Sequence, residues 1–474
     1  RYGLTGTPMS NDYQELWQLF DFVSCKQVGE KKDFNQFYSR ALKDGQQRLA
    51  RQDQLATRLR RQEQLKALMD RWMLQRFKTI ISDQLPKKED TIVFCEMAAR
   101  QKRVYKRVLE SPDYVCLANR EEPCACGSGE LTKDCHGFDP DGVLWQAHHI
   151  DENGEVMESC EKCEGRGGCS RCIGMPAITK LMRIANHLEL LKPDERNTCK
   201  KCGPCRAKQF DACEKTAREL AFARMAMGQE HSGSLLRDAS FLSQSSDSHC
   251  GKMQTLKQLL RMWHKKQQKV LLFSYSTQML DILEDFVTRL AYSHLRLDGS
   301  TPQARRQKLV DEFNSTPASQ KFLFLLSTKA GGLGINLVSA TVVVVFDPNW
   351  NPSHDMQAQD RAYRIGQRHD VKVFRLMSSN SVEEKIYQRQ LYKQGQEGVA
   401  LHQRDENRYF DAVHGRADKK GELFGMKNLL AFDATKVAGT SGGAAARAPT
   451  KAILEREKTK ANDDSAADRA AAAA

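Results

Sequence analysis

The sequence predicts an α/β protein in which a doubly wound parallel sheet follows a helical segment and a cysteine-rich insert. From Lys252 onward, short and almost continuously apolar segments alternate with helical patterns, which is typical of a parallel sheet covered on both faces. Twelve of the fifteen cysteines lie in short-spaced clusters between Cys116 and Cys213. Residues 48–78 are rich in lysine and arginine and carry apolar residues at helical spacing, which indicates a largely solvated helix.

These changes in composition divide the chain into four predicted segments. Residues 1–110 would be the helical end of a first unit, and residues 111–250 the cysteine-rich insert with a serine-rich linker. Residues 251–400 would hold the sheet. Residues 401–474 form a tail that becomes rich in alanine and glycine after about Phe432, and we expect this last part to be disordered.

Five strand candidates make up the predicted sheet. They are VLLF (270–273), HLRL (294–297), FLFLL (322–326), VVVVF (342–346) and VKVFRL (371–376). Ser381 and Glu384 fit a capping box that would begin a helix after the last strand. Ligands of such sheets bind at the carboxyl ends of the strands, so functional loops are expected there.

The charge balance favours a polyanionic partner. Lysine and arginine number 73 against 60 aspartates and glutamates, which gives a net charge of +13 and a pI of about 9.0. Charge alone leaves open the alternative of a solvated basic surface. No apolar run approaches the ~20 residues that span a bilayer, and no apolar leader opens the chain, so we expect a soluble protein that is not secreted. Clustered cysteines in a reducing compartment indicate metal binding.

The first cysteine cluster has the spacing of a zinc site. Cys124, Cys126, Cys135 and His136 form Cys-x-Cys-x8-Cys-His, and three thiolates with one imidazole satisfy tetrahedral zinc. The Gly-Ser-Gly stretch after Cys126 would supply the turn that returns the chain to the metal. The stretch resembles the short zinc-binding motif at the C-terminus of the bacterial SecA translocase. Free thiols are the alternative.

Two more clusters contain four cysteines each. The first has the pattern Cys-x2-Cys-x5-Cys-x2-Cys of a four-thiolate zinc site and consists of Cys160, Cys163, Cys169 and Cys172. The second has the pattern Cys-x2-Cys-x2-Cys-x7-Cys and consists of Cys199, Cys202, Cys205 and Cys213. An iron–sulfur cluster is the rival for the second, but its last cysteine is misplaced for a ferredoxin, which favours zinc. We therefore expect two or three zinc ions, in a module whose own target stays open.

The stretch 327–367 carries the strongest functional signal. Its loop STKAGGLGINL follows an apolar strand candidate, and three closely spaced glycines would let the backbone approach a bulky anion. Further on, Arg361 and Arg364 are three residues apart, as on one helix face, and their planar forks suit bidentate contact with phosphate oxygens. Structural salt bridges to Asp360 or Asp355 are the alternative role for these arginines.

The order and spacing of these segments resemble motifs V and VI of the superfamily-two helicases, in the SWI/SNF branch of DNA-dependent ATPases. Segments KVLLFS, LRLDGST and LTGTPMSN resemble motifs IV, IVa and III of the same family. The matching pieces reach from Tyr2 to about Leu391, interrupted by one large insert. RYFDAVHG and GELFGMKNLLAF resemble the tail of the Cockayne-syndrome-B-like and excision-repair-cross-complementing-like subgroup.

The resemblance implies a RecA-like helicase C-terminal lobe and a set of site residues. Arg361 and Arg364 would stabilise charge on a transferred phosphoryl group. The implied nucleotide-binding residues are Gly332, Gly334, Gln357 and Asp360. The implied DNA-backbone contacts, hydroxyl and lysine groups among them, are Ser327, Thr328, Lys329, Ser274, Thr5, Gly6 and Thr7. A capping role is the alternative for Ser327.

Two motifs of a complete motor are not found in the sequence. There is neither a G-x-x-x-x-G-K-[ST] phosphate loop nor an Asp-Glu box, and Gly251-Lys252 lacks the upstream glycine. We therefore expect no ATPase activity from this chain alone; ATP and magnesium would serve the complete two-lobed parent.

The implied function is ATP-dependent translocation on double-stranded DNA, without sequence preference, in DNA repair or chromatin remodelling in the nucleus. A nucleosome or repair and transcription proteins could bind through the insert. The alternative is a non-catalytic adaptor that binds zinc and DNA and keeps a helicase-like lobe.

Overall fold

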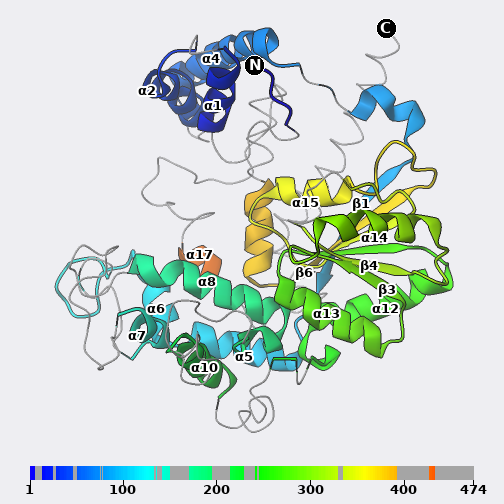
Figure 1. The fold of residues 1–474 in the computed structure, drawn as a ribbon. Helices are drawn as coiled ribbons and strands as arrows, with labels where there is room; N and C mark the ends of the chain where they lie inside the picture. Colours follow the sequence, from blue (N-terminus) through cyan, green and yellow to red (C-terminus); the bar gives the residue numbers. More distant parts are fainter. Residues whose placement is uncertain are drawn as a thin grey trace.

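A six-stranded parallel sheet with helices on both faces lies at one side of the molecule, at the right of the view in Figure 1. The structure is a computed structural model, and it describes residues 1–5, 13–24, 28–45, 51–74, 76, 78–132, 135, 141–149, 170–194, 214–228, 241–242, 245–328, 335–391 and 426–432. No helix in these ranges is both long and apolar enough to cross a membrane.

The strand order is β1-β6-β5-β2-β4-β3, and every neighbouring pair is parallel. The strands are β1 (Lys88–Cys95), β2 (Val270–Ser274), β3 (His294–Leu297), β4 (Leu323–Ser327), β5 (Val342–Val345) and β6 (Val371–Ser378). Every residue of β2, β4 and β5 is buried, which explains their continuous apolar sequences. The five predicted strands and the doubly wound α/β fold are confirmed.

The sixth strand comes from a part of the chain that the sequence placed with the first unit. β1 pairs with β6 over its whole length, from Lys88 opposite Val371 to Cys95 opposite Ser378. It begins with three charged residues and lies at the sheet edge, where one face of a strand can remain in water, so its sequence lacks the apolar signal of the central strands. The sheet therefore draws on residues before position 110. The four-segment division itself stays a prediction.

Two pairs of helices cover the sheet on opposite faces (Figure 1). On one face, α12 (Gly251–Lys265) and α13 (Thr277–Arg289) share a buried cluster with Leu272 and Val344. On the other, α14 (Gln303–Ser315) and α15 (Pro352–Gln359) share a cluster with Leu271 and Val343. Successive strand residues alternate between the two clusters, as the two-residue period of a strand requires.

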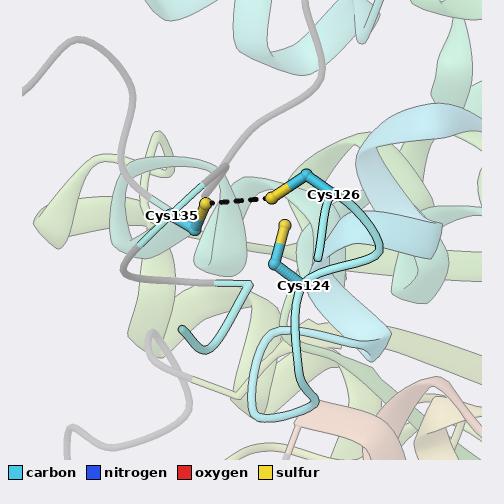
Figure 2. Close-up of side chains that lie close together, drawn as sticks. All are labelled: Cys124, Cys126 and Cys135. Carbon is cyan, nitrogen blue, oxygen red and sulfur yellow. Dashed lines mark hydrogen bonds between the residues drawn. The ribbon is translucent and has the colours of Figure 1, made fainter. Parts of the chain in front are cut away.

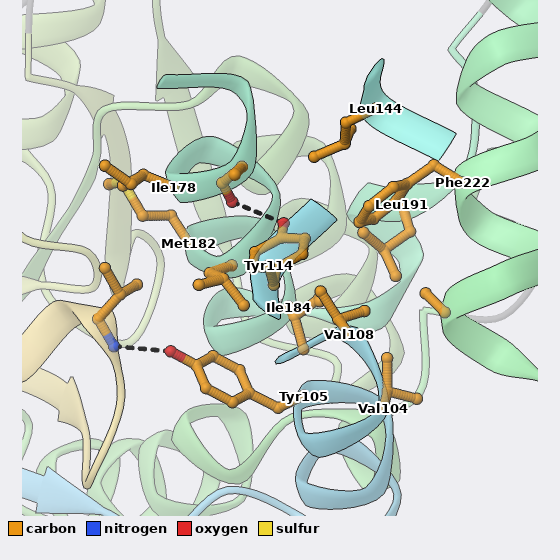
Figure 3. Close-up of a cluster of buried hydrophobic side chains, with 14 of the residues drawn as sticks. Val104, Tyr105, Val108, Tyr114, Leu144, Ile178, Met182, Ile184, Leu191 and Phe222 are labelled. Atoms are coloured by element: carbon orange, nitrogen blue, oxygen red, sulfur yellow. Dashed lines mark hydrogen bonds between the residues drawn. The ribbon is translucent and has the colours of Figure 1, made fainter. Parts of the chain in front are cut away.

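The insert folds in part as a helical bundle with its own core (Figure 3). The helices of this bundle are α5 (Ala99–Leu109), which precedes the insert, and α6 (Pro112–Ala118), α7 (Val143–His149), α8 (Ser170–Asn186), η3 (Leu188–Leu191) and α10 (Glu214–Met227) within it. Tyr114 donates its hydroxyl to the carbonyl of Ala177 at 2.9 Å. The Tyr105 hydroxyl accepts the N–H of Val382 at 2.9 Å, which ties the bundle to helical residues 382–391 after the last strand.

A short helix from the C-terminal segment completes this bundle. In α17 (Met426–Leu430), Leu429 and Leu430 are buried in the bundle core, and the ring of Phe432 lies 5.2 Å from that of Tyr105. The segment described here belongs to the tail sequence that resembles the excision-repair subgroup. Because Leu429, Leu430 and Phe432 pack in the bundle core, this segment has a structural role.

The N-terminal helices form a separate small core. They are α1 (Tyr13–Ser24), α2 (Lys31–Phe34), the π-helix η1 (Asn35–Arg40), α3 (Ala41–Gly45) and α4 (Gln52–Trp72). Leu65 and Met69 of α4 are buried, whereas most of its charged residues are exposed, which confirms the predicted solvated helix. Short 3-10 helices η2 (Lys78–Gln84) and η6 (Asp247–His249) lie in the connections.

Candidate functional site

The predicted DNA contacts Ser274 and Ser327 end two paired strands at the carboxyl edge of the sheet. They lie opposite each other in the β2–β4 register, and the N–H of Thr328 donates to the carbonyl of Ser274 at 3.1 Å. All three side chains are buried, at 5% exposure or less. Ser274 donates its hydroxyl to Asp347 Oδ2 at 2.9 Å, so in this structure it orients the loop after β5. The hydroxyl of Thr328 is buried and has no partner among the described residues.

A buried ionic network lies directly behind this edge. Lys252 and Glu383 are fully buried, and the Lys252 Nζ is 2.8 Å from Glu383 Oε1. The same Nζ donates to Asn186 Oδ1 at 2.5 Å and to the carbonyl of Phe346 at 2.9 Å. Lys252 is the lysine of the Gly251-Lys252 pair in the sequence. Its ammonium is buried and makes its contacts inside the fold.

Close backbone packing explains the glycine of that pair. A Cβ at Gly251 would come within 1.7 Å of the carbonyl oxygen of Glu96, which no side chain could accommodate. The N–H of Gly251 donates to Gln101 Oε1 at 2.9 Å. The Gly-Lys pair is thus a packing and ion-pair element that joins α12 to the end of β1.

Asp347, in the segment DPNWNP, is the second buried acid of this region. It is fully buried and accepts hydrogen bonds from the Ser274 hydroxyl and from the N–H of Tyr275, at 2.9 and 3.1 Å. Burial raises the pKa of the Asp347 carboxyl to about 7, against the opposing effect of the Lys252 ammonium. The sequence did not predict a role for Asp347, Lys252 or Glu383; a charged residue beside the end of an apolar strand was the only signal that it offered.

The motif V and motif VI segments contact each other through the backbone. The N–H of Leu337 donates to the carbonyl of Arg361 at 2.9 Å, and Arg364 Nη1 is 3.4 Å from the carbonyl of Ile335. The Gln367 amide donates to the carbonyls of Ala340 and Ala362, at 2.9 and 3.2 Å. The two sequence segments singled out for function are therefore adjacent in space. Lys329, Gly332 and Gly334 lie outside the described residues.

The two arginines do not share a helix face, contrary to the expectation from their spacing. Helix α15 ends at Gln359, and residues 360–366 form successive turns in which the N–H of Ala362 bonds to the carbonyl of Gln359 at 3.1 Å. The N–H of Leu337 takes the Arg361 carbonyl and the Gln367 side chain takes the Ala362 carbonyl, so neither carbonyl is left for a further turn of helix.

Within these turns Arg361 is half-buried and Arg364 is exposed. Burial, and then the neighbouring Arg364, lower the pKa of the Arg361 guanidinium. Two like charges held this close favour an anionic ligand between them.

Lys78 crosses over from η2 to the motif VI turn. Its Nζ is 2.7 Å from Asp360 Oδ1 and donates to the carbonyl of Tyr363 at 2.9 Å. Burial lowers the pKa of Lys78, and Asp360 opposes that shift. Lys88 of β1 donates to Gln359 Oε1 at 2.8 Å, beside the same turn. In this structure Asp360 thus holds a lysine from the N-terminal part of the chain.

The remaining predicted contacts lie on α15 and near the start of the chain. Gln357 lies on α15 and is partly exposed, and Thr5 is exposed near the start of the chain. Gly6 and Thr7 lie outside the described residues. Their predicted contacts with nucleotide or DNA stay predictions.

Three of the predicted zinc ligands converge (Figure 2). The sulfur atoms of Cys124, Cys126 and Cys135 lie within 4.8 Å of one another, with Cys126 and Cys135 at 3.4 Å. Zinc–sulfur bonds of about 2.3 Å in a tetrahedron place ligand sulfurs roughly 3.8 Å apart, so the three thiols fit one ion. The Ser128 hydroxyl and N–H lower the pKa of the Cys126 thiol to about 6, which favours the thiolate that binds metal.

A tight turn brings these cysteines together. The N–H of Cys124 donates to the carbonyl of Glu130 at 2.8 Å, and that of Cys135 to the carbonyl of Leu131 at 3.0 Å. Gly127 and Gly129 have φ values of +79° and +77°, which explains the predicted Gly-Ser-Gly turn. His136, Cys160, Cys163, Cys169, Cys199, Cys202, Cys205 and Cys213, and the side chain of Cys172, lie outside what the structure describes.

Two family models match separate parts of the chain. Residues 1–130 match the SNF2-related domain and residues 251–366 the helicase conserved C-terminal domain. "Switch 2" of Arabidopsis thaliana is 43% identical over 434 residues, which cover 91% of this chain and 47% of that protein. "DNA excision repair protein ERCC-6-like 2" of Mus musculus is 38% identical, covering 91% of this chain and 25% of that protein.

Similarity extends to a yeast protein and to one solved structure. "DNA repair and recombination protein RAD26" of Saccharomyces cerevisiae is 31% identical, covering 86% of this chain and 29% of that protein. The chain spans less than half the length of each of these three relatives. The solved "Crystal structure of the C-terminal part of Fun30 ATPase domain" is 27% identical, with a TM-score of 0.41, covering 68% of this chain and 100% of that chain.

Proposed function

The chain belongs to the SWI/SNF branch of the superfamily-two helicases, with relatives of the excision-repair type, and on this premise we propose that it is the C-terminal part of an ATP-dependent translocase on double-stranded DNA. This translocase would act in DNA repair or chromatin remodelling in the nucleus. Its RecA-like helicase C-terminal lobe would close over nucleotide against a first lobe.

The proposal rests mainly on the contact between the motif V and motif VI segments. Leu337 and Ile335 fix the turn that carries Arg361 and Arg364, so a bound phosphate and a bound DNA strand would be sensed by one connected unit. Ser327 and Thr328 end a buried strand immediately before the glycine-rich loop. Contacts with the phosphate backbone carry no sequence information, which suits movement along any duplex.

In the proposed motor the arginines act on charge that develops late in the reaction. ATP with magnesium would supply the transferable phosphoryl group, and Arg361 and Arg364 would stabilise its equatorial oxygens. Arg364 is exposed and can reach outward, whereas Arg361 is held by the fold. The cysteine cluster would bind zinc through Cys124, Cys126 and Cys135 and so stabilise the loop between α6 and α7.

A non-catalytic adaptor that binds zinc and duplex DNA is the second candidate. The net charge of +13 supports DNA binding in either case. The two functions differ in one respect: only the translocase requires Arg364 for hydrolysis of ATP.

The deciding experiment measures DNA-stimulated ATP hydrolysis by a protein that joins this chain to a complete first lobe. We expect Arg364→Ala to reduce kcat on the order of 10³-fold with little change in KM for ATP, as for an arginine finger. Arg364→Lys should not restore it, because an ammonium lacks the bidentate fork. Arg305→Ala, an exposed position on α14, serves as the matched control. Turnover within a few-fold of the parent in both Arg364 variants would contradict the translocase assignment.

A further inference from the structure

A basic cavity lies at the amino ends of three neighbouring strands, away from the predicted DNA contacts. It has a volume of about 700 Å³, and its wall includes Lys269, Thr341 and Asp370. These residues come directly before β2, β5 and β6. Ser274 ends β2 at the opposite edge. A five-residue strand spans roughly 16 Å, so a ligand here is distinct from a DNA strand held at Ser274.

Positive charge predominates in this cavity. Lys266, Lys269, Arg368 and Lys372 line it, whereas Asp370 is the one carboxylate among its lining residues. Asp370 Oδ1 already accepts the backbone N–H of Lys87 at 3.0 Å. Lys372 is 4.0 Å from Glu89, at the limit of an ion pair, and both of these side chains are about half exposed. The cations are therefore poorly neutralised by the protein itself.

Lys269 is a buried cation whose only close partners are uncharged. The residue is 6% exposed, its Nζ donates to the carbonyl of Phe313 and lies 3.5 Å from Ser339 Oγ. In the part of the chain that the structure describes, no carboxylate lies within ion-pair distance of it, and burial lowers its pKa. A buried charge without a counter-ion is costly, so an anion in the cavity would relieve this cost.

We propose that this cavity binds a phosphate-bearing anion. Its volume exceeds that of a single phosphate and suits a polyphosphate chain or consecutive phosphodiesters, and lysine with arginine is the usual set of phosphate ligands. The wall also contains Gly366 and Gln367, and the side-chain amide of Gln367 donates to the carbonyl of Ala362. A bound anion would therefore contact the end of the turn that carries Arg364.

The phosphates could come from a free polyphosphate or from a nucleic-acid backbone. In the second case they would belong to a duplex segment other than the one at Ser274, because of the separation across the sheet. Neither source requires the chain to be a translocase, so the proposal stands or falls independently of the ATPase assignment.

The test uses the full chain and two variants that remove charge from the cavity. Lys269→Met keeps the aliphatic stem but removes the buried ammonium, and Arg368→Gln removes an exposed rim cation. Lys308→Gln, an exposed lysine on α14 outside the cavity, is the matched charge control. Calorimetry measures binding of inorganic tripolyphosphate at low salt, and fluorescence anisotropy measures binding of a short duplex over a range of salt.

We expect saturable tripolyphosphate binding to the parent and to Lys308→Gln, weakened at least tenfold in Lys269→Met and less in Arg368→Gln. If the natural source is a backbone, Lys269→Met should also weaken duplex binding and reduce its salt slope by about one. If the natural source is free polyphosphate, Lys269→Met should bind the duplex as tightly as Lys308→Gln does. In the absence of phosphate, Lys269→Met should unfold at the same temperature as the parent or higher, because the ammonium that it removes is buried without a counter-ion. Absence of saturable tripolyphosphate binding, or equal affinities in all four proteins, would overturn the proposal.

Discussion

Lys252 and Asp347 show how single buried charges organise the carboxyl edge of the sheet. Lys252 is held by Glu383, Asn186 and a backbone carbonyl, so removing any one partner would leave part of a buried charge uncompensated. Asp347 connects the ends of β2 and β5 through Ser274 and Tyr275. The loops next to the proposed DNA site are thus supported by polar groups that have no access to water.

Asp347 should make the stability of the fold depend on pH near neutrality. Its folded-state pKa of about 7 lies above the ordinary value near 4, so the folded state binds the proton more tightly. The free energy of unfolding should therefore fall as pH rises from about 4 to about 7, by on the order of a few kcal/mol, and then level off. Asp347→Asn should remove this pH-dependent part of the free energy of unfolding.

Urea unfolding of parent and Asp347→Asn between pH 5 and pH 8 measures the difference, with exposed Asp311→Asn as control. Equal pH dependence in parent and Asp347→Asn would show that the carboxyl keeps an ordinary pKa.

The Lys78–Asp360 ion pair should couple the N-terminal part of the chain to the motif VI turn. Both side chains are more than 40% exposed, so solvent screening limits the expected coupling to about 0.5–1 kcal/mol. A double-mutant cycle of Lys78→Gln and Asp360→Asn, read by chemical unfolding, measures it. The exposed i,i+4 pair Lys106–Glu110 on α5 should give less than about 0.5 kcal/mol in the same assay. Additive effects of the two Lys78–Asp360 substitutions would mean that the contact contributes nothing.

At the scale of elements, two segments pack far from their sequence neighbours. β1 joins the sheet beside β6, and α17 completes the core of the insert bundle. In both cases a few apolar side chains enter a core that other elements build. Such segments depend on tertiary packing, because neither is long enough to be stable alone.

The docking of α17 should depend on its leucines and little on its charge. Leu429 is 2% exposed, and Leu429→Ala should cost about 2–4 kcal/mol of local stability through the cavity that it leaves. Lys427→Ala removes only the 2.5 Å contact with Glu122, in which the lysine side chain is 73% exposed, and should cost less than about 1 kcal/mol. Amide hydrogen exchange of α6 and α17 distinguishes the two, and faster exchange in Lys427→Ala than in Leu429→Ala would contradict this ranking.

At the scale of the whole molecule, the insert and the sheet have distinct hydrophobic clusters. The bundle is joined to the sheet by apolar packing, as at Leu190 of η3, and by polar contacts such as Tyr105 with Val382. The cysteine cluster lies in the loop between α6 and α7 and outside both cores. Metal bound there would stabilise the insert more than the sheet.

Zinc removal should accordingly unfold part of the insert and leave the sheet intact. Elemental analysis of the purified chain is expected to give close to three zinc ions, and Cys126→Ser should lower the count by about one. Chelation should speed amide exchange around Cys124 while β2, β4 and β5 stay protected. Less than one equivalent of zinc, or visible absorption from an iron–sulfur cluster, would refute the all-zinc assignment.

The sequence by itself determined the sheet and the family. Three of its strands, β2, β4 and β5, are buried throughout, so nearly every residue in them is apolar, and these three with β3 and β6 could be located from the chain alone. The spacing of the glycine-rich loop, the two arginines and the first cysteine cluster likewise follows from local chemistry. Those patterns depend on neighbouring residues, and they were readable without a structure.

Only the tertiary structure decided which distant residues meet. β1 has a charged start and an edge position, so its strand character depends on β6. The helix before Arg361 ends at Gln359, and the carbonyl of Arg361 instead accepts the N–H of Leu337, a residue far away in the sequence. Lys78, Lys252 and Lys269 look alike in sequence, yet one pairs with Asp360 at the surface, one is neutralised in the core and one is buried without a counter-ion. The partner of a charge is set by packing between elements, and no local pattern encodes it.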